Sequence, residues 1–176
     1  MDNEILKTIK ARRSVRKYIH EKQIDDETLR LILEAGTFAA TGMGRQSPII
    51  IAVQNQEDIN IMRRLNAAIM GNPNSDPFYG APTVVVVLAD RNIGTRTEDG
   101  SLVIGNMMLA AESLGVSSCW IHRAKETFNT DEGKLSLKKW GISGDYEGVG
   151  NCILGYLDGE KPNAKERKAD YIKIIK

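Results

Sequence analysis

The residues best suited to binding or catalysis form a short basic segment near the N-terminus, Arg12-Arg13-Ser14-Val15-Arg16-Lys17-Tyr18. It places four cations and one hydroxyl within six positions. Guanidinium groups form paired hydrogen bonds to phosphate oxygens, and a hydroxyl can serve a third oxygen, so this set suits a phosphate monoester. If the segment is extended, Arg12, Ser14 and Arg16 face one side and Arg13 and Lys17 face the other. A solvated surface patch is the alternative interpretation of any short basic run.

Two other stretches could contact a bound molecule. Residues 39–48 contain Gly42 and Gly44, whose spacing lets the backbone approach a ligand closely or adopt positive φ. The stretch is not GxGxxG and no strand precedes it, so it predicts neither a Rossmann nor a P-loop site, and an ordinary helix-to-strand loop is the alternative. The pair His122-Arg123 follows an apolar run. A second group of cations, near the C-terminus, could bind an anion or form a solvated tail: Lys161, Lys165, Arg167 and Lys168.

The sequence gives no sign of a metal site or of a catalytic nucleophile. No His/Cys/Asp cluster has zinc-ligand spacing, and no GxSxG signature is present. A single histidine such as His122 is more often structural than catalytic, and His20 is expected in a loop. We therefore predict no metal and no dedicated side-chain acid or base.

Bulk properties predict one domain, residues 1–176, with enough chain for a real core. The net charge of +1 gives no global field that would recruit nucleic acid or an anionic membrane, so any anion site must be local. Cys119 and Cys152 sit in apolar runs without a CxxC pair, which predicts buried free thiols and a reducing, cytoplasmic location. The acidic N-terminus has no signal-peptide pattern, and the longest apolar run, 81–89, is too short to span a bilayer.

Hydrophobic periodicity predicts helices alternating with short buried strands. We expect Asp2 or Asn3 to cap the first helix and Asp25 the second. The segment 101–114 is apolar almost all round, which places it inside the fold or at a subunit interface. The alternation predicts a layered sheet-and-helix domain. The expected helices are 3–11, 26–38, 57–70, 101–114 and 131–140, and the expected strands are 49–53, 83–89, 116–121 and 149–157.

The motifs in this order resemble the nitroreductase family of FMN-dependent oxidoreductases over most of the chain. The resemblance rests on five stretches, each short, whose order and spacing together make it specific. They are Arg-Arg-Ser-x-Arg at 12–16, Thr-Gly-Met-Gly-Arg-Gln-Ser-Pro at 41–48, Phe-Tyr-Gly-Ala-Pro at 78–82, Leu-Gly-Val-Ser-Ser-Cys-Trp-Ile at 114–121, and the strand 149–157 followed by Lys-Glu-Arg-Lys at 165–168.

This resemblance implies an α+β fold, an α/β/α sandwich with a central mixed sheet flanked by helices, in a domain-exchanged homodimer. It also implies a role for each matching residue. The FMN phosphate and ribityl chain would be held by Arg12, Arg13, Ser14 and Arg16, with Lys165 and Arg167 reaching the phosphate from the C-terminal end. Asn66 would hydrogen-bond the pyrimidine edge of the flavin, and Ile121, His122 and Arg123 would lie along the ring with a backbone N–H aimed at N5. A loop from the partner subunit would cover the ring through Thr41, Gly42, Met43 and Gly44, supported by Gln46.

Two departures from the family pattern bear on function. Gln-Ser-Pro at 46–48 replaces Gln-Pro-Trp, so a packing aromatic is missing and a looser loop is expected. His122-Arg123 stands where the family often has a small or acidic residue, which brings cationic potential near the ring. The chain is short, so the helices that some members use as a substrate lid are expected to be absent.

The function implied is transfer of hydride from NAD(P)H, through FMN, to a small electron-poor acceptor of nitroaromatic or quinone type, by a ping-pong mechanism. Three alternatives stay open at the level of sequence. They are a non-redox flavin-binding protein for storage or sensing, a different flavin-dependent enzyme of dehalogenase or flavin-degrading type, and a phosphoanion-binding domain without flavin.

Overall fold

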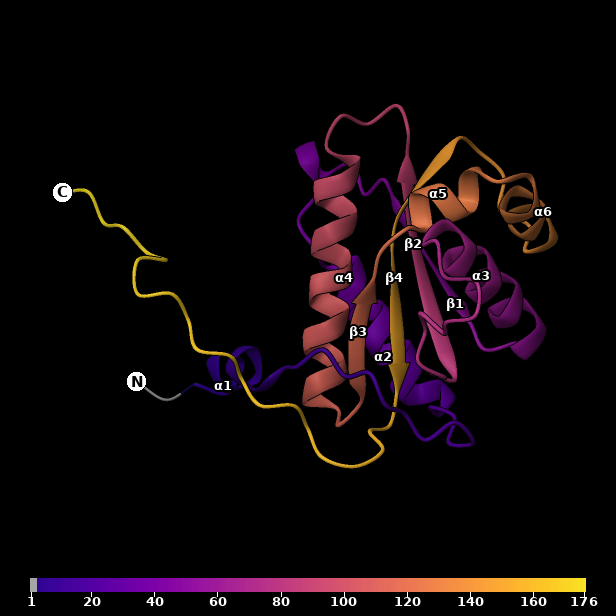
Figure 1. Ribbon diagram of the computed structural model, residues 1–176. Coiled ribbons are helices and arrows are strands. Elements are labelled where there is room, and N and C mark those ends of the chain that lie inside the picture. The colour runs from indigo at the N-terminus through magenta and orange to yellow at the C-terminus, as the bar shows by residue number, and fades with distance from the viewer. Residues whose placement is uncertain (1–2) are drawn as a thin grey trace.

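The computed structural model describes residues 3–176 and has a sheet with helices on both of its faces (Figure 1). The strands are β1 (Pro48–Val53), β2 (Thr83–Asp90), β3 (Ser117–Ile121) and β4 (Tyr146–Gly155). The helices are α1 (Glu4–Ala11), α2 (Asp26–Thr37), α3 (Gln56–Ile69), α4 (Arg96–Ser113), α5 (Ala124–Asn129) and α6 (Asp131–Lys139), and a 3-10 turn, η1, spans Gly42–Gly44.

The four strands lie in the order β1-β2-β4-β3, and every neighbouring pair in this ladder is antiparallel. The four strands of the single chain thus form an antiparallel sheet, and the expectation of a mixed sheet is wrong for them. The parallel pairing that does occur is an isolated bridge between Ser14 and Ser118, where the basic segment meets the β3 edge. The expected α/β/α layering is confirmed.

Each face of the sheet has its own hydrophobic core because side chains alternate along a strand. One face packs under α3 and α5 and includes Val84, Val86 and Ile153. The other packs under α2 and α4 and includes Val85 and Val87. The two cysteines follow this alternation: Cys119 belongs to the first core and Cys152 to the second, so the thiols lie on opposite faces. Both are free and buried, as predicted.

The predicted helix starts agree with the observed caps. Asp25 accepts a hydrogen bond from the Thr28 N–H at the start of α2, and Asn3 accepts from two backbone N–H groups of α1. Asp2, the other candidate for the α1 cap, lies outside the described residues. Strand β4 begins at Tyr146, before the expected start at 149, and two helices also differ from prediction. Helix α4 begins at Arg96, a turn or more before the expected start at 101, because its first turn is polar and does not show the apolar pattern. Helix α5 was not predicted, because six residues are too few to establish a period.

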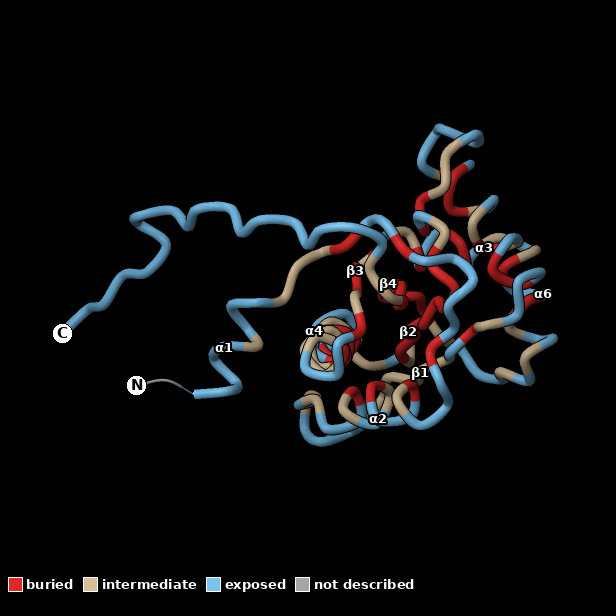
Figure 2. Tube along the Cα trace, turned by 90° about the horizontal axis from the view of Figure 1, so that it is seen from below, coloured by how far each residue is buried: buried red, intermediate tan, exposed pale blue. Residues whose placement is uncertain are grey.

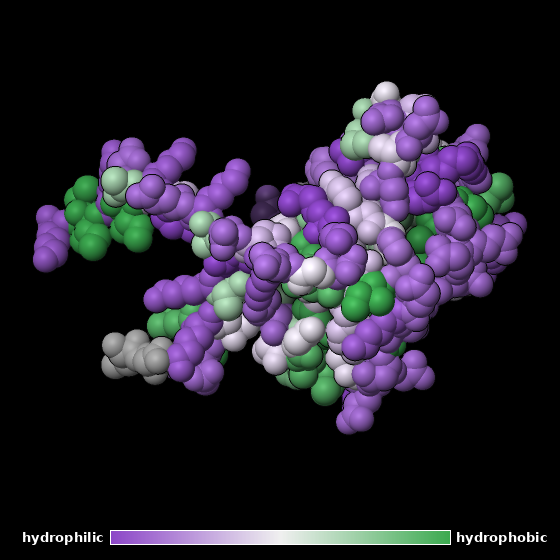
Figure 3. Space-filling view, turned by 60° about the horizontal axis from the view of Figure 1, so that its bottom comes forward, coloured by the Kyte–Doolittle hydropathy of each residue, from purple (hydrophilic) through white to green (hydrophobic). Residues whose placement is uncertain are grey.

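Helix α1 and the C-terminal tail project from the body on the same side and bury little of their own apolar surface (Figures 1 and 2). The shared apolar face of α1 is exposed, and so are the apolar residues that end the tail (Figure 3). Helix α4 likewise buries only one side within the chain, and Leu102 is half exposed on the other. The exposed residues of α1 and the tail are Ile5, Leu6, Ile9, Tyr171, Ile172, Ile174 and Ile175.

Across residues 3–176, none of the helices combines the length and the apolar composition needed to cross a bilayer.

Candidate functional site

The basic segment is fixed against the free edge of β3. The Val15 N–H donates to the Ser118 carbonyl at 3.0 Å, and the Ile19 N–H donates to the Tyr156 carbonyl at 2.9 Å. Val15 and Tyr18 are buried in the core beneath, and the Tyr18 hydroxyl donates to the Val15 carbonyl at 2.8 Å. These anchors hold the segment extended, so the residues between them turn alternately toward and away from the sheet edge.

The three residues expected to face one side, Arg12, Ser14 and Arg16, all act on the Cys119 thiol. Burial raises the pKa of that thiol, while Arg16, a hydrogen bond with Ser14, and Arg12 each act to lower it. The same field of Arg12 reaches Cys152 on the other face, whose pKa burial raises to about 12. Both thiols are therefore protonated near neutral pH, and the positive potential at this edge is available to another anion.

Arg12 is the member of this group with an unmet bonding requirement. Its Nη1 atom is buried and has no hydrogen-bond partner among the described residues. A buried charged donor without a partner carries a free-energy cost, and a bound anion would remove that cost. The two residues expected to face away are each bound to other groups. Arg13 donates to the carbonyls of Lys10 and Arg12 at the end of α1, and Lys17 pairs with Asp158 at 3.0 Å.

The loop between α3 and β2 contacts the exposed side chain of Arg16. The Arg16 guanidinium carbon lies 6.0 Å from the centre of the Tyr79 ring, within range of a cation–π contact. Asp76 fixes this turn by accepting from the Phe78 and Gly80 N–H groups, at 2.9 and 2.6 Å. Gly80, at φ +68, packs so closely on His20 that a Cβ would lie 1.8 Å from its ring. The expected loop position of His20 is confirmed, and its role is to seat this turn.

A second cluster lies where β3 ends and α5 begins. Asn66 is completely buried and donates through Nδ2 to the His122 carbonyl at 2.8 Å. Its Oδ1 accepts from Arg123 Nε at 3.0 Å. Ile121 is buried, whereas His122 is exposed. The structure therefore brings together four of the residues expected beside the flavin ring, and the Asn66 amide forms two hydrogen bonds to this turn of its own chain.

The two clusters occupy the two ends of one short strand. Ser118 meets the basic segment near the start of β3, and His122 follows its end. A strand rises about 3.3 Å per residue, so these positions are separated by roughly 13 Å. An elongated ligand with a phosphate at one end could contact both clusters along the edge of the sheet.

The loop 41–46 lies elsewhere, beside the first turn of α4. The Gly42 N–H donates to Asp99 Oδ1 at 2.9 Å, and Thr95 Oγ1 donates to the other oxygen of the same carboxylate at 3.0 Å. Asp99 is buried, and a Cβ at Gly42 would lie 2.3 Å from the Thr95 hydroxyl. Thr41 accepts from the Gln46 N–H at 3.1 Å, which closes the loop on itself. These hydrogen bonds hold the loop against α4, although a looser loop was expected from the missing aromatic residue.

Left-handed backbone at three positions shapes the tip of this loop. Met43, Gly44 and Gln46 have φ of 58°, 66° and 51°. Met43 is 87% exposed, so the tip presents an apolar side chain to the outside. Helix α4 has 18 residues, so its ends are separated by about 27 Å, and the Ser14–Ser118 bridge lies near the far end. The loop cannot cover the Arg12 end of the site in the same chain.

Lys165 and Arg167 lie exposed on the projecting tail. The tail that carries them runs away from the body on the side to which α1 projects (Figure 1). Among the described residues, neither side chain forms a hydrogen bond or ion pair with the basic segment. Earlier along the tail, Lys161 pairs with Glu112 of α4. The structure of one chain therefore assembles the N-terminal cations and leaves the C-terminal ones apart from them.

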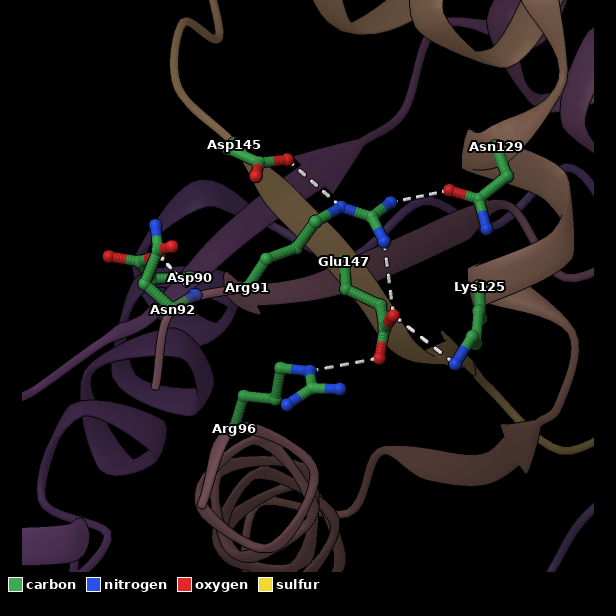
Figure 4. A network of polar contacts seen from close by, with 8 residues as sticks. All are labelled: Asp90, Arg91, Asn92, Arg96, Lys125, Asn129, Asp145 and Glu147. Carbon is green, nitrogen blue, oxygen red and sulfur yellow. Dashed lines mark hydrogen bonds and ion pairs between the residues drawn. The ribbon is translucent and has the colours of Figure 1, made fainter. Parts of the chain in front are cut away.

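A buried carboxylate that the sequence did not single out organises the opposite end of the sheet (Figure 4). Glu147 accepts from Arg91, Arg96 and Lys125, at 3.1, 3.1 and 3.2 Å. Burial by itself raises the pKa of Glu147, but the hydrogen bonds from Lys125 and Arg96 outweigh it and hold that pKa below its ordinary value. Since Arg96 starts α4 and Lys125 lies in the first turn of α5, this network fixes the helix beneath loop 41–46 relative to the helix that follows His122.

Sequence reasoning missed three contributors to the site: Tyr79, Asp99 and Glu147. Asp99 gave no distinct signal, because it follows Glu98 in the polar first turn of α4. Among the described residues, no group of three His, Cys, Asp or Glu side chains could hold a metal ion.

Comparison with known proteins gives one consistent result. The model of the Nitroreductase family matches residues 9–77 and 66–156. A crystal structure of a nitroreductase with bound FMN from Bacteroides fragilis is 34% identical and covers 99% of this chain and 100% of its own, with a TM-score of 0.91. A nitroreductase with bound FMN from Desulfitobacterium hafniense is 28% identical, with full coverage of both chains and a TM-score of 0.89.

A curated relative from Methanothermobacter thermautotrophicus is named "Putative NADH dehydrogenase/NAD(P)H nitroreductase". It is 27% identical over 121 residues, which is 66% of this chain and 60% of the relative. The match thus spans less than two thirds of the relative's own length.

Proposed function

The chain belongs to the nitroreductase family, and we propose that it is an FMN-dependent oxidoreductase that takes electrons from NAD(P)H and reduces an electron-poor organic acceptor. The observation that carries the proposal is the buried, unpartnered Nη1 of Arg12 beside Ser14 and Arg16. A dianionic phosphate would satisfy that donor, and two FMN-bound nitroreductases share this fold over essentially the whole chain.

The residues present fit FMN along the β3 edge. Arg12, Ser14 and Arg16 would hold the phosphate and the ribityl chain, since all three act on the Cys119 thiol and Ser14 bridges to Ser118 at this edge. The ribityl chain separates the phosphate from the ring by a span of the same order as the distance between the two clusters. Ile121, His122 and Arg123 would then lie along the ring, with a backbone N–H of this turn aimed at N5. Asn66 would position the turn at His122 and Arg123, to which it is hydrogen-bonded. Any hydrogen-bonding capacity left on its amide would serve the pyrimidine edge of the flavin.

Arg13 remains part of the proposed site in a reduced role. Its Nη1 is committed to two carbonyls at the end of α1, so it would add charge near the phosphate and fix the start of the segment. Lys165 and Arg167 would reach the same phosphate only if the tail adopts another course, for example in an assembled dimer.

We propose a homodimer because several apolar surfaces of the chain have no cover of their own. These are the exposed face of α1, the outer side of α4 and the apolar end of the tail. The outer edge of β1 also has no strand partner in the described residues. A partner's tail laid along that edge could supply the parallel pairing expected of a mixed sheet. The partner's loop 41–46 would cover the ring in this dimer, since its tip presents the exposed Met43 to the outside of the chain.

The chemistry supplied by bound FMN is acceptance of a hydride from NAD(P)H and its transfer to the acceptor, which no side chain can provide. The chain's own residues bind and orient. The cations and backbone N–H groups at the site stabilise negative charge that develops on the bound molecule. Met43 at the tip of the partner's loop would exclude water from the ring face. In the ping-pong order we propose, the oxidised nicotinamide leaves before a nitroaromatic or quinone occupies the same face.

The test is the colour of the full chain purified without added flavin. We expect a yellow protein whose released flavin chromatographs as FMN, and whose visible absorbance bleaches on anaerobic addition of NADH or NADPH. Reoxidation by a nitroaromatic or quinone would complete the cycle. A colourless protein that takes up no FMN would refute the proposal. A yellow protein that NAD(P)H does not bleach would instead favour a storage or sensing role, and turnover confined to a dehalogenation or flavin-degradation assay would favour the third alternative.

A further inference from the structure

Arg123 holds a backbone conformation that side chains rarely adopt. It is the N-cap of α5, with φ 75° and ψ 15°, in the left-handed region. In that region glycine is unstrained, whereas any residue with a Cβ meets its own carbonyl oxygen. A long cationic side chain therefore stands at a position where the backbone alone would favour glycine. Such outliers persist where the surrounding structure holds them, and they concentrate at functional sites.

The Arg123 side chain is held in place at one end only. Its Nε donates to the fully buried Asn66, which also donates to the carbonyl of His122, so the three residues form a closed clasp. Arginine has five N–H donors, and Nε supplies one of them. The four donors on the two terminal nitrogens have no hydrogen-bond partner within residues 3–176. The guanidinium is therefore oriented while its outer edge stays available.

The charge of Arg123 is also unneutralised, in contrast to its neighbours. Lys125 pairs with Glu147, and Arg64 on α3 pairs with Glu132. Within the described chain no carboxylate forms an ion pair with Arg123, which is only partly exposed. An oriented, half-buried guanidinium with a free edge is suited to the paired hydrogen bonds of a carboxylate.

We infer that Arg123 determines specificity by binding an anionic group, of carboxylate type, on the acceptor that is reduced at this site. The inference rests on the proposed function, because the acceptor must lie against the flavin beside residues 121–123. It adds the substrate class: nitroaromatics or quinones that carry a carboxylate are preferred over neutral ones of the same shape. Hydrogen bonds to charged groups are strong enough to change the specificity constant by about ten- to hundredfold.

The variants separate the side chain from the backbone strain. Arg123→Ala and Arg123→Gly both remove the guanidinium, but only glycine relieves the left-handed strain. Arg123→Gly should therefore melt about 2–4 °C above Arg123→Ala, and it carries the test if the alanine variant folds poorly. Arg123→Lys keeps the charge without the fork. Arg64→Ala is the matched control, because it removes a cation from α3 that is exposed and already paired.

The experiment measures kcat/KM for 4-nitrobenzoate and for 4-nitrobenzamide, and compares their ratio among variants reconstituted with FMN. In both Arg123→Ala and Arg123→Gly the ratio should fall about ten- to hundredfold, with an intermediate fall in Arg123→Lys and the wild-type ratio in Arg64→Ala. A second readout needs no turnover: titration of the flavin absorbance should show benzoate binding tighter than benzamide in the wild type, and this preference should disappear in Arg123→Gly.

The outcomes distinguish this inference from the proposed function. Equal losses on the charged and neutral acceptors, or a ratio unchanged in both truncations, would overturn the role of Arg123 while leaving the oxidoreductase intact. A loss confined to flavin reduction by NAD(P)H would overturn it too, because the cation would then serve the donor. A wild-type chain that binds no FMN would remove both proposals together.

Discussion

Replacement of Arg12 by alanine tests the phosphate end of the site most directly. Arg12 has a buried Nη1 without a hydrogen-bond partner among the described residues. In the flavin-free chain, truncation to alanine therefore removes no hydrogen bond of this atom. Leaving a charged donor buried and unpaired costs free energy. We therefore expect the flavin-free Arg12→Ala protein to fold and to melt at or above the wild-type temperature.

The expected loss is confined to the FMN complex. A hydrogen bond to a charged group contributes about 1.5–3 kcal/mol, so the dissociation constant for FMN should rise roughly 10- to 150-fold. With FMN in excess, a hundredfold weaker dissociation constant removes about 2.7 kcal/mol of ligand-derived stability. For a chain of this length that corresponds to about 5–10 °C less stabilisation by FMN.

The assay is titration of flavin fluorescence with FMN and, in parallel, with riboflavin, which lacks the phosphate. Arg12→Ala should weaken FMN strongly and riboflavin little. Arg30→Ala is a suitable control, because Arg30 is an exposed cation on α2 that pairs with Glu34. Turnover of the FMN-saturated variant should suffer less than its affinity.

Two results would refute this reasoning. Unchanged affinity for FMN would mean that the orphaned donor of Arg12 does not meet the phosphate. Equal weakening of FMN and riboflavin would mean that the mutation deforms the whole site instead of removing one contact.

Three further perturbations test the loop, the tail and the buried carboxylate. Asp99→Ala removes both hydrogen bonds that the carboxylate accepts beside loop 41–46. The free energy of unfolding should fall by about 1–3 kcal/mol, and amide hydrogen exchange in the loop should accelerate. Unaltered exchange would show that other contacts hold the loop. Deletion of residues 170–176 should convert a dimer to a monomer by light scattering and weaken FMN binding, and an unchanged mass would contradict the proposed exchange of tails. Glu147 has a lowered pKa, so its contribution to stability is present above its ordinary pKa of 4.5 and is lost as the pH falls through the lower folded-state value. Glu147→Gln should flatten this part of the acid-unfolding curve. An identical curve would mean that the network carries no pH-dependent stability.

Much of the fold could be predicted because the necessary information is local. Helix α2 is an example: Asp25 caps it, and the stripe from Leu29 to Gly36 lies on one face and is buried in the core. Strands β1 and β2 were recognisable as β-branched runs, and the cysteines as buried thiols, from their immediate neighbours. Where local signals were weak, prediction failed, as at the polar first turn of α4 and at the six-residue α5.

The chemically active groups of this protein can be read from its residues in order: a cluster of cations around one serine, a glycine-bearing loop, and His122-Arg123 after a buried strand. How these groups are used depends on the packing of the folded chain. Packing leaves a donor of Arg12 without a partner among the described residues. It also forms the hydrogen bonds of Arg123 with Asn66 and of Gly42 with Asp99, each between residues 57 positions apart in the chain. Side-chain periodicity describes neighbours along the backbone, whereas these contacts depend on how separate elements pack and on which polar groups that packing leaves unsatisfied.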